Sequence, residues 1–192
     1  LSSDHIPYVA LDEVDRYPWD VGGEGDPLTL ISNRQRNFTR AKTFLLSTPT
    51  HDQHSRIWQA YLDGDQRKFL VPCPECFAYQ PLERTRFRYR LDKTPSGRQE
   101  KQAEPVEHGA AVDPDGVVIE AYFVCADCGS EIHERSKPWL LAKGRWQPTA
   151  AARNPGTHSY HLSGAYSPIG LGLSWRALGQ RLHRAQSDDS RL

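Results

Sequence analysis

The cysteines of this chain occur as two Cys-x-x-Cys pairs, Cys73 with Cys76 and Cys125 with Cys128, which account for all four in the sequence. Two such knuckles offer four thiolates, which is a ligand set of closed, structural Zn²⁺ sites. The segment between the pairs, 77–124, exceeds the usual ribbon spacing of about 15–20 residues, so part of it must bulge out. The alternatives are two disulfides, which are rare in the cytosol, or four free thiols. We predict a structural zinc site.

The two knuckles differ at the position after the second cysteine. Zinc knuckles usually have glycine there, because the backbone turns tightly with a positive φ. Gly129 fits this pattern, whereas Phe77 departs from it. We therefore expect strain or a slightly different turn at Phe77, without loss of the metal.

Two adjacent carboxylates, Asp12 and Glu13, follow the apolar segment Tyr8–Leu11. Charge at the end of a buried strand is costly unless something compensates it, and Mg²⁺ bound to phosphate oxygens is such a compensation. In nucleotide-hydrolysing motors the first acid holds the hydration shell of the metal, and the second polarises the attacking water. The alternative is a strand end with two solvated acids, because Asp-Glu alone is a weak motif.

Hydroxyl side chains follow a second apolar segment, Thr43–Leu46, at Ser47, Thr48 and Thr50. A hydroxyl can bond either a γ-phosphate or the attacking water, and it can change partner after hydrolysis. Pro49 stiffens the turn that presents these groups. The alternative is an ordinary turn at a strand end, which the composition equally allows.

Arginine recurs at every second position near the first cysteine pair, at Arg84, Arg86, Arg88 and Arg90. In a strand this alternation would put all four guanidinium groups on one face, where they would suit a nucleic-acid phosphate backbone. The alternative is a solvated strand face with salt bridges, which is the usual meaning of a charge run.

The nucleotide-site candidates require a strand–helix–strand unit. Tyr8–Leu11 is short and rich in β-branched and aromatic residues, which fits a strand covered on both faces. A helix is expected over about 28–40 and a second strand at Thr43–Leu46. Strands joined in this way pair in parallel. A short helix should follow at Ser55–Leu62.

The cysteine region has the texture of short strands and turns. We expect a strand at Val117–Val124 that leads into the second knuckle, and a loop over 94–116, which is rich in proline, glycine and charge. A strand at Ser159–Leu162 and a helix at Ser174–Arg184 should close the chain. Ser174 is a favourable N-cap for that helix.

The order of motifs resembles the ATPase core of the tailed-phage terminase large subunit, in its lambda-like branch. The resemblance rests first on D-E-x-D-x-Y-P, V-G-G-E-G-D-P and K-x-F-L-L-S-T-P-T. It continues through S-R-I, D-Q-R-K-F-L-V-P-C-P-E-C, Y-F-V-C-A-D-C-G, K-G-R-W and H-L-S-G-A-Y-S-P. It covers about residues 6–182, and the loop over 94–116 is least like the family.

The resemblance implies an α/β fold, namely part of a parallel-sheet, P-loop-type ATPase core with an inserted small β-rich zinc ribbon. Residues 1–68 would belong to the core, 69–138 to the ribbon, and 139–192 to a return to the core towards a nuclease domain. Asp12 would be the Walker B aspartate on Mg²⁺ and Glu13 the catalytic glutamate. Ser47, Thr48 and Thr50 would form the coupling motif.

The resemblance also implies partners and cofactors. These are ATP, Mg²⁺ and Zn²⁺, double-stranded viral DNA, a small terminase subunit and the portal of a procapsid, with the subunits in a ring in the cytoplasm of a bacterial host. The sequence contains no G-x-x-x-x-G-K-[ST] loop and no methionine. We therefore expect an internal fragment that does not hydrolyse ATP alone. Two alternatives are a zinc-ribbon nucleic-acid-binding module without ATPase activity and an inactive prophage remnant.

Composition adds few constraints. The formal net charge is zero and the sequence pI is about 7.2, so the whole-chain charge predicts neither nucleic-acid nor membrane binding. Mean hydropathy is −0.68, and no apolar run approaches the roughly 20 residues that span a bilayer. The N-terminal residues lack the pattern of a signal peptide. We expect a cytosolic protein without a membrane partner.

Overall fold

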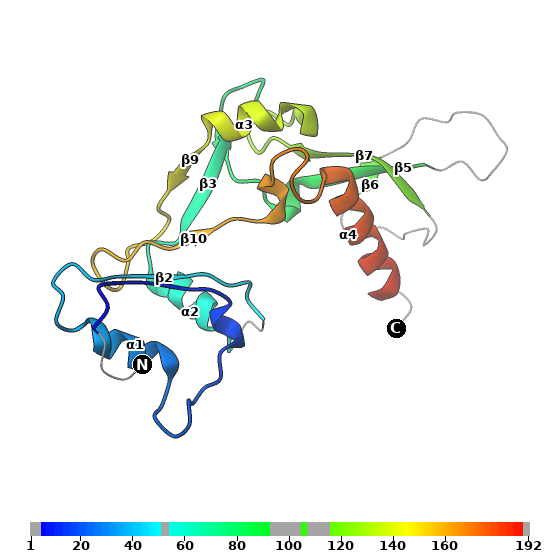
Figure 1. The fold of residues 1–192 in the computed structure, drawn as a ribbon. Helices are drawn as coiled ribbons and strands as arrows, with labels where there is room; N and C mark the ends of the chain where they lie inside the picture. Colours follow the sequence, from blue (N-terminus) through cyan, green and yellow to red (C-terminus); the bar gives the residue numbers. More distant parts are fainter. Residues whose placement is uncertain (1–4, 51–53, 93–104, 107–115, 190–192) are drawn as a thin grey trace. The chain divides into compact units, whose positions relative to one another are not determined.

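The computed structural model describes residues 5–50, 54–92, 105–106 and 116–189. The chain divides into two compact units (Figure 1). Unit 1 contains residues 1–66 and 150–159, and unit 2 contains residues 67–149 and 160–192. The described residues form a mixed α/β fold with small sheets and four α-helices. None of these helices has the length and apolar character needed to cross a membrane.

Unit 1 is built on the predicted strand–helix–strand segment. Strand β1 (Tyr8–Leu11) pairs in parallel with β2 (Lys42–Leu45), and helix α1 (Pro27–Gln35) lies between them in the chain. The N-cap of α1 is Asp26, whose carboxylate accepts the amide hydrogen of Thr29 at 3.0 Å. The strand–helix–strand order and the parallel pairing are confirmed. The expected extension of the helix to residue 40 is wrong, because α1 ends at Gln35.

The two-stranded sheet of unit 1 is less covered than its sequence predicts. The side chains of Tyr8 in β1 and Phe44 in β2 are 62% and 58% exposed. Full burial of β1 would require neighbours on both faces, and β1 and β2 are the only strands that pair within the described part of unit 1. The expectation of a strand buried on both faces is therefore wrong, and within the described residues β1 pairs with β2 alone.

Helix α2 (Arg56–Asp63) anchors the segment that follows β1. Its first residue, Arg56, is buried and donates hydrogen bonds to the carbonyl oxygens of Tyr17 and Pro18 at 2.7 and 2.9 Å. The same guanidinium lies 3.0 Å from the Asp26 carboxylate and over the ring of Trp19. A buried guanidinium needs many acceptors, so Arg56 holds this loop in one conformation.

A second segment, 150–159, joins unit 1 through polar contacts. The buried Ser159 hydroxyl donates to the carbonyl oxygen of Tyr61 at 2.8 Å and accepts the amide hydrogen of Gln66 at 2.8 Å. The Asp65 carboxylate accepts the Ser159 amide hydrogen at 3.0 Å and lies 2.7 Å from Nδ1 of His158. These bonds join the two chain segments of unit 1 near their ends, at Gln66 and Ser159.

Within its described residues, unit 2 contains two small sheets and two α-helices. The first sheet comprises β3 (Arg67–Pro72), β4 (Tyr79–Gln80), β9 (Arg145–Gln147) and β10 (Tyr160–His161). The second comprises β5 (Phe87–Asp92), β6 (Pro105–Val106), β7 (Val117–Val124) and β8 (Glu131–His133). The helices are α3 (Lys137–Lys143) and α4 (Trp175–Asp189). The strand prediction for Val117–Val124 is confirmed. Most of the expected loop over 94–116 lies outside the described residues.

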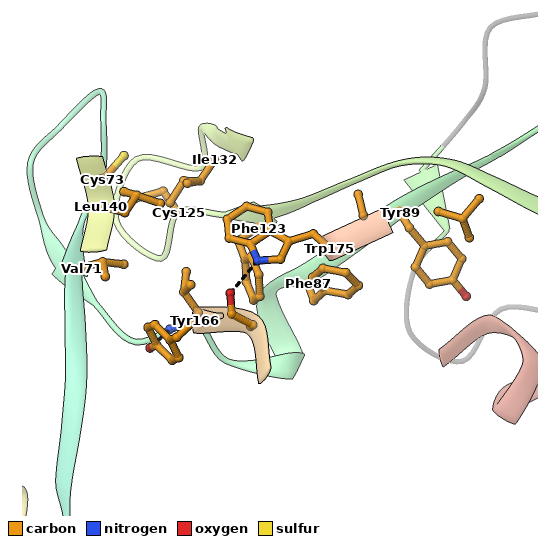
Figure 2. Packing of buried hydrophobic residues seen from close by; sticks show 14 of the residues in the cluster. Val71, Cys73, Phe87, Tyr89, Phe123, Cys125, Ile132, Leu140, Tyr166 and Trp175 are labelled. Atoms are coloured by element: carbon orange, nitrogen blue, oxygen red, sulfur yellow. Dashed lines mark hydrogen bonds between the residues drawn. The ribbon is translucent and has the colours of Figure 1, made fainter. Parts of the chain in front are cut away.

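The core of unit 2 is aromatic and includes two of the cysteines. Trp175 is fully buried, donates its indole N–H to the carbonyl oxygen of Ala165 at 2.7 Å and meets Phe123 edge to face (Figure 2). Figure 2 also shows Cys73 and Cys125 at one end of the same cluster. Two of the four metal-ligand candidates, Cys73 and Cys125, are therefore packed into the core.

The residues that follow α3 pack against the strands of unit 2. Strands β9 and β10 both pair with β3, and α4 packs against β7 and β5 (Figure 1). The contact between helix and sheet is close, because a Cβ added at Gly179 of α4 would lie 3.3 Å from the side chains of Tyr89 and Val118. The division into two units groups 67–149 and 160–192, so most of the segment 139–192 lies in the same unit as the cysteines.

Candidate functional site

The first cysteine knuckle is a tight turn between β3 and β4. The amide of Cys73 donates to the carbonyl oxygen of Ala78 at 2.9 Å, and the amide of Phe77 donates to the carbonyl oxygen of Cys73 at 3.0 Å. The amide of Glu75 lies 3.4 Å from the sulfur of Cys73 and points a donor at it. These bonds present the sulfurs of Cys73 and Cys76 from a fixed backbone.

The backbone at Phe77 has the positive φ that zinc knuckles usually reserve for glycine. Its φ is +60°, close to the +75° of Gly129 at the same position of the second knuckle. A side chain in the left-handed region is strained, since Cβ crowds the backbone there. The expected strain at Phe77 is therefore confirmed, and the two knuckles nevertheless form the same turn.

The four sulfurs converge on one point. The Sγ atoms of Cys73 and Cys128 are 3.8 Å apart, those of Cys76 and Cys125 are 3.7 Å apart, and all four lie within 4.8 Å of one another. Four sulfurs held about 2.3 Å from a tetrahedral Zn²⁺ would be about 3.8 Å apart. A disulfide requires sulfurs about 2.05 Å apart, so none is formed. The donor set and spacing fit a metal ion.

The thiols of the cluster perturb one another. Burial would raise the pKa of the Cys125 thiol, but the backbone amides of Cys128 and Asp127 point at it and lower that pKa to about 6. The Ala78 amide would lower the pKa of Cys76, but burial and the neighbouring sulfurs raise it to about 12. Four thiolates so close together repel one another, so a bound cation is needed to hold all of them deprotonated.

The candidate nucleotide residues lie where β1 and β2 end. The Asp12 carboxylate accepts the amide hydrogen of Glu13 at 2.9 Å, and both side chains are exposed. Glu13 has φ +54° and ψ +42°, a left-handed conformation for a non-glycine residue. Strain of this kind clusters at functional sites, because the surrounding structure must enforce it. Here the backbone of Val14 is held by a hydrogen bond to Leu46.

Asp15 connects this strand end to the hydroxyl segment. Its carboxylate accepts the amide and hydroxyl hydrogens of Thr50, at 2.9 and 3.2 Å, and the amide hydrogen of Ile57 in α2 at 2.8 Å. Its own amide donates to the hydroxyl of Ser47 at 3.3 Å. Sequence reasoning gave Asp15 no role, although its position in D-E-x-D-x-Y-P was a signal.

These contacts lower the pKa of Asp15. Partial burial would raise the pKa of its carboxyl group, but hydrogen bonds from Ile57, Ser55 and Thr50 outweigh burial and hold the pKa below its ordinary value. Ser47 and Thr50 are thus brought to the end of β1 through Asp15. Thr48 is exposed, and its carbonyl oxygen accepts the Ser47 hydroxyl hydrogen at 3.2 Å.

The expected stripe of four arginines is not formed. Arg84 and Arg86 lie in a 3-10 turn (Arg84–Arg86), and β5 begins only at Phe87. The strand prediction is therefore wrong for this half of the segment. Arg88 lies in β5 and donates to the carbonyl oxygens of Thr85 and Phe87 at 2.8 and 2.9 Å.

Arg90 follows the alternative of a salt-bridged strand face. Its guanidinium bonds the carboxylates of Glu120 in β7 and Glu131 in β8 and lies over the ring of Tyr122. Partial burial would lower the pKa of Arg90, but the two carboxylates raise it. Its charge is therefore satisfied within the sheet, whereas Arg84 and Arg86 are exposed.

Comparison with known proteins identifies one family. The family described as phage terminase large subunit gpA, ATPase domain, matches residues 1–146. The matched segment contains both carboxylates of the strand end, the hydroxyl segment and all four cysteines. None of the curated proteins and none of the solved structures matches the chain.

The sulfur geometry predicts that unit 2 requires its metal. We expect one Zn²⁺ per chain, and we expect a strong chelator to remove it and abolish the near-ultraviolet circular dichroism of the buried Trp175. The reason is that Cys73 and Cys125 belong to the core, and binding free energy becomes folding free energy in such modules. Elemental analysis and circular dichroism measure both effects. Unchanged spectra after complete metal removal would contradict the prediction.

The contacts of Asp15 predict a pH-dependent contribution to stability. Asp15→Asn should make the Thr50 and Ile57 amides exchange with solvent about 5–150-fold faster at neutral pH, because a carboxylate bond contributes about 1–3 kcal/mol. Since the folded pKa is lowered, this contribution is present above the ordinary carboxyl pKa and is lost as pH falls through the folded value. Hydrogen exchange by NMR measures it. Glu24→Gln, on an exposed loop, is the matched control, and equal exchange in both variants would contradict the assignment.

Proposed function

Because this chain belongs to the family of phage terminase large subunit gpA ATPase domains, we propose that it works in a motor that hydrolyses ATP to move double-stranded DNA into a viral capsid. The family match carries the proposal. The position of Asp12 and Glu13 after β1, beside the end of β2, supports it. Ligands of open α/β sheets bind outside the carboxyl ends of parallel strands.

The proposed roles follow from the chemistry of the two carboxylates. Asp12 would hold Mg²⁺, which is a hard cation that prefers carboxylate oxygens and retained waters. The ion would neutralise charge on the phosphates of bound ATP. Glu13 would accept a proton from the attacking water as general base. The backbone of Glu13 is left-handed, and its carboxylate is exposed and therefore accessible to substrate.

The hydroxyl segment would act as the coupling element. Ser47 and Thr50 are bonded to Asp15, only two residues beyond Glu13, and Asp15 is also bonded to α2. If ATP hydrolysis displaced the hydroxyls, Asp15 would move with them, and its hydrogen bond to the N-terminus of α2 would change. Thr48 has an exposed side chain and would be available to a nucleotide or to water.

The 192 residues contain no phosphate-loop sequence. We propose that this chain alone neither binds ATP tightly nor hydrolyses it, and that the phosphate-binding lysine and amides are supplied elsewhere in the terminase. In the same assembly, a nuclease activity would cut genome ends, a small terminase subunit would select the DNA, and a ring of large subunits would engage the portal of the procapsid. Its place of action would be the cytoplasm of the bacterial host.

The four-cysteine cluster would hold Zn²⁺ with a structural role. All four ligands come from the protein, so the coordination shell is closed and leaves no position for substrate. The ion would join the β3–β4 turn to the β7–β8 turn. The cluster thus supports the motor by stabilising unit 2, and it is not itself a catalytic centre.

The proposed role of Glu13 as general base predicts that its replacement changes kcat and leaves KM nearly unchanged. In the terminase holoenzyme, Glu13→Gln should lower kcat for ATP hydrolysis about 10²–10⁴-fold with little change in KM, because the amide cannot take the proton from water. Steady-state ATPase assays measure both constants, with Glu24→Gln as the control. Wild-type kcat in the Glu13 variant would overturn the assignment, and turnover by the isolated chain would overturn its proposed inactivity.

Two of the four candidate DNA-contacting arginines, Arg84 and Arg86, are exposed. Arg84 and Arg86 would contact phosphates, whereas Arg88 and Arg90 are engaged within the protein. Replacing Arg84 and Arg86 by alanine should reduce the slope of log K against log salt by about 2 for double-stranded DNA, since each lost phosphate contact removes about one released counterion. Fluorescence titration of DNA at several salt concentrations measures the slope. Arg181→Ala in α4 is the control, and an unchanged slope in the double variant would contradict the proposal.

A further inference from the structure

The two cysteine knuckles match each other bond for bond in their backbones. In the first, Cys73 pairs with Ala78 through a hydrogen bond of 2.9 Å, and in the second, Cys125 pairs with Ser130 at 2.9 Å. The amides of Glu75 and Asp127 each lie 3.4 Å from the first sulfur of their own knuckle. The chain therefore contains two copies of one turn, and differences between equivalent positions can be compared directly.

The position after Phe77 and Gly129 also differs between the knuckles, and here the difference brings a hydroxyl group to the sulfurs. The first knuckle ends with the methyl group of Ala78, and the second ends with the hydroxyl of Ser130. The Ser130 oxygen lies 3.1 Å from the sulfur of Cys128 in its own knuckle and 3.2 Å from the sulfur of Cys73 in the other. Within the described residues, the Ser130 hydroxyl is the one side-chain group outside the four cysteines that lies within hydrogen-bonding distance of the sulfurs.

A hydroxyl in this position has a defined effect on a thiolate. Its single hydrogen can be donated to either sulfur, which withdraws charge from that ligand and restrains its direction. Cys128 is the exposed cysteine, whereas Cys73 is buried, so the hydroxyl connects the most accessible ligand to one fixed in the core. Outer-shell donors of this kind commonly change metal affinity about 10–100-fold when they are removed.

We propose that Ser130 is a positioning residue of the metal centre, which fastens the exposed Cys128 to the buried Cys73 and slows the loss of the metal. This inference rests on the proposed four-cysteine metal site. It implies that the centre is asymmetric: the Cys128 side, which solvent reaches, is restrained by a hydroxyl, and the other knuckle has no hydroxyl. Chelators and electrophiles should attack the centre first at Cys128, and Ser130 should set the rate.

The test compares metal release from full 192-residue chains loaded with Zn²⁺. Ser130→Ala should release Zn²⁺ to a chromogenic chelator about 10–100-fold faster than the wild type, while Ser130→Thr, which keeps the hydroxyl, should release it at close to the wild-type rate. Ala78→Ser is the matched control in the other knuckle. Circular dichroism of each loaded protein verifies that the variants are folded before release begins.

A spectroscopic measurement separates hydrogen bonding from looser packing. In Co²⁺-loaded protein, loss of an O–H···S bond raises the energy of the sulfur electrons, so Ser130→Ala should shift the sulfur-to-cobalt charge-transfer bands to lower energy. Equal release rates and identical bands in Ser130→Ala and wild type would overturn the role of Ser130. Failure of the wild-type chain to bind Zn²⁺ or Co²⁺ would instead overturn the proposed metal site, so the two failures are distinguishable.

Discussion

The convergence of four sulfurs is the constraint on which unit 2 depends. Two of them, on Cys73 and Cys125, are buried in the aromatic core, and all four lie within 4.8 Å of one another. Such a cluster is unfavourable as thiolates without a cation and incompatible with a disulfide at the observed spacing. The metal would therefore link the β3–β4 turn to the β7–β8 turn, and with them the two sheets. Helix α4 and the buried Trp175 complete the core that this link organises.

Unit 1 is held by a different kind of interaction. Its apolar sheet is two-stranded and largely exposed, so polar side chains supply much of its order. The buried Arg56 fixes the loop after β1, and Asp15 joins β1, the hydroxyl segment and α2. Both are charged groups that receive several hydrogen bonds, which is how a charge is tolerated away from water. These contacts present Asp12 and Glu13 at the strand end.

The features that the sequence predicted correctly are local in origin. The four cysteines lie close together, as their spacing in two pairs predicted, and the strand–helix–strand order of unit 1 follows from short-range periodicity. The errors concern partners distant in the chain. Arg90 is neutralised by Glu120 and Glu131, which no local pattern connects to it, and Arg84 lies in a turn that alternation alone cannot distinguish from a strand. Tertiary contacts also determine the exposure of β1, the bridging role of Asp15 and the position of Ser130.

Zinc K-edge X-ray absorption of the purified chain would show whether the four cysteines hold the ion, because it reports the ligands of the ion without assuming a fold. We expect one shell of four sulfur neighbours at about 2.3 Å, with no lighter ligand. A shell that contains nitrogen or oxygen, fewer than four sulfurs or no bound zinc would contradict it. In any of those cases, the close approach of the two knuckles would need another explanation.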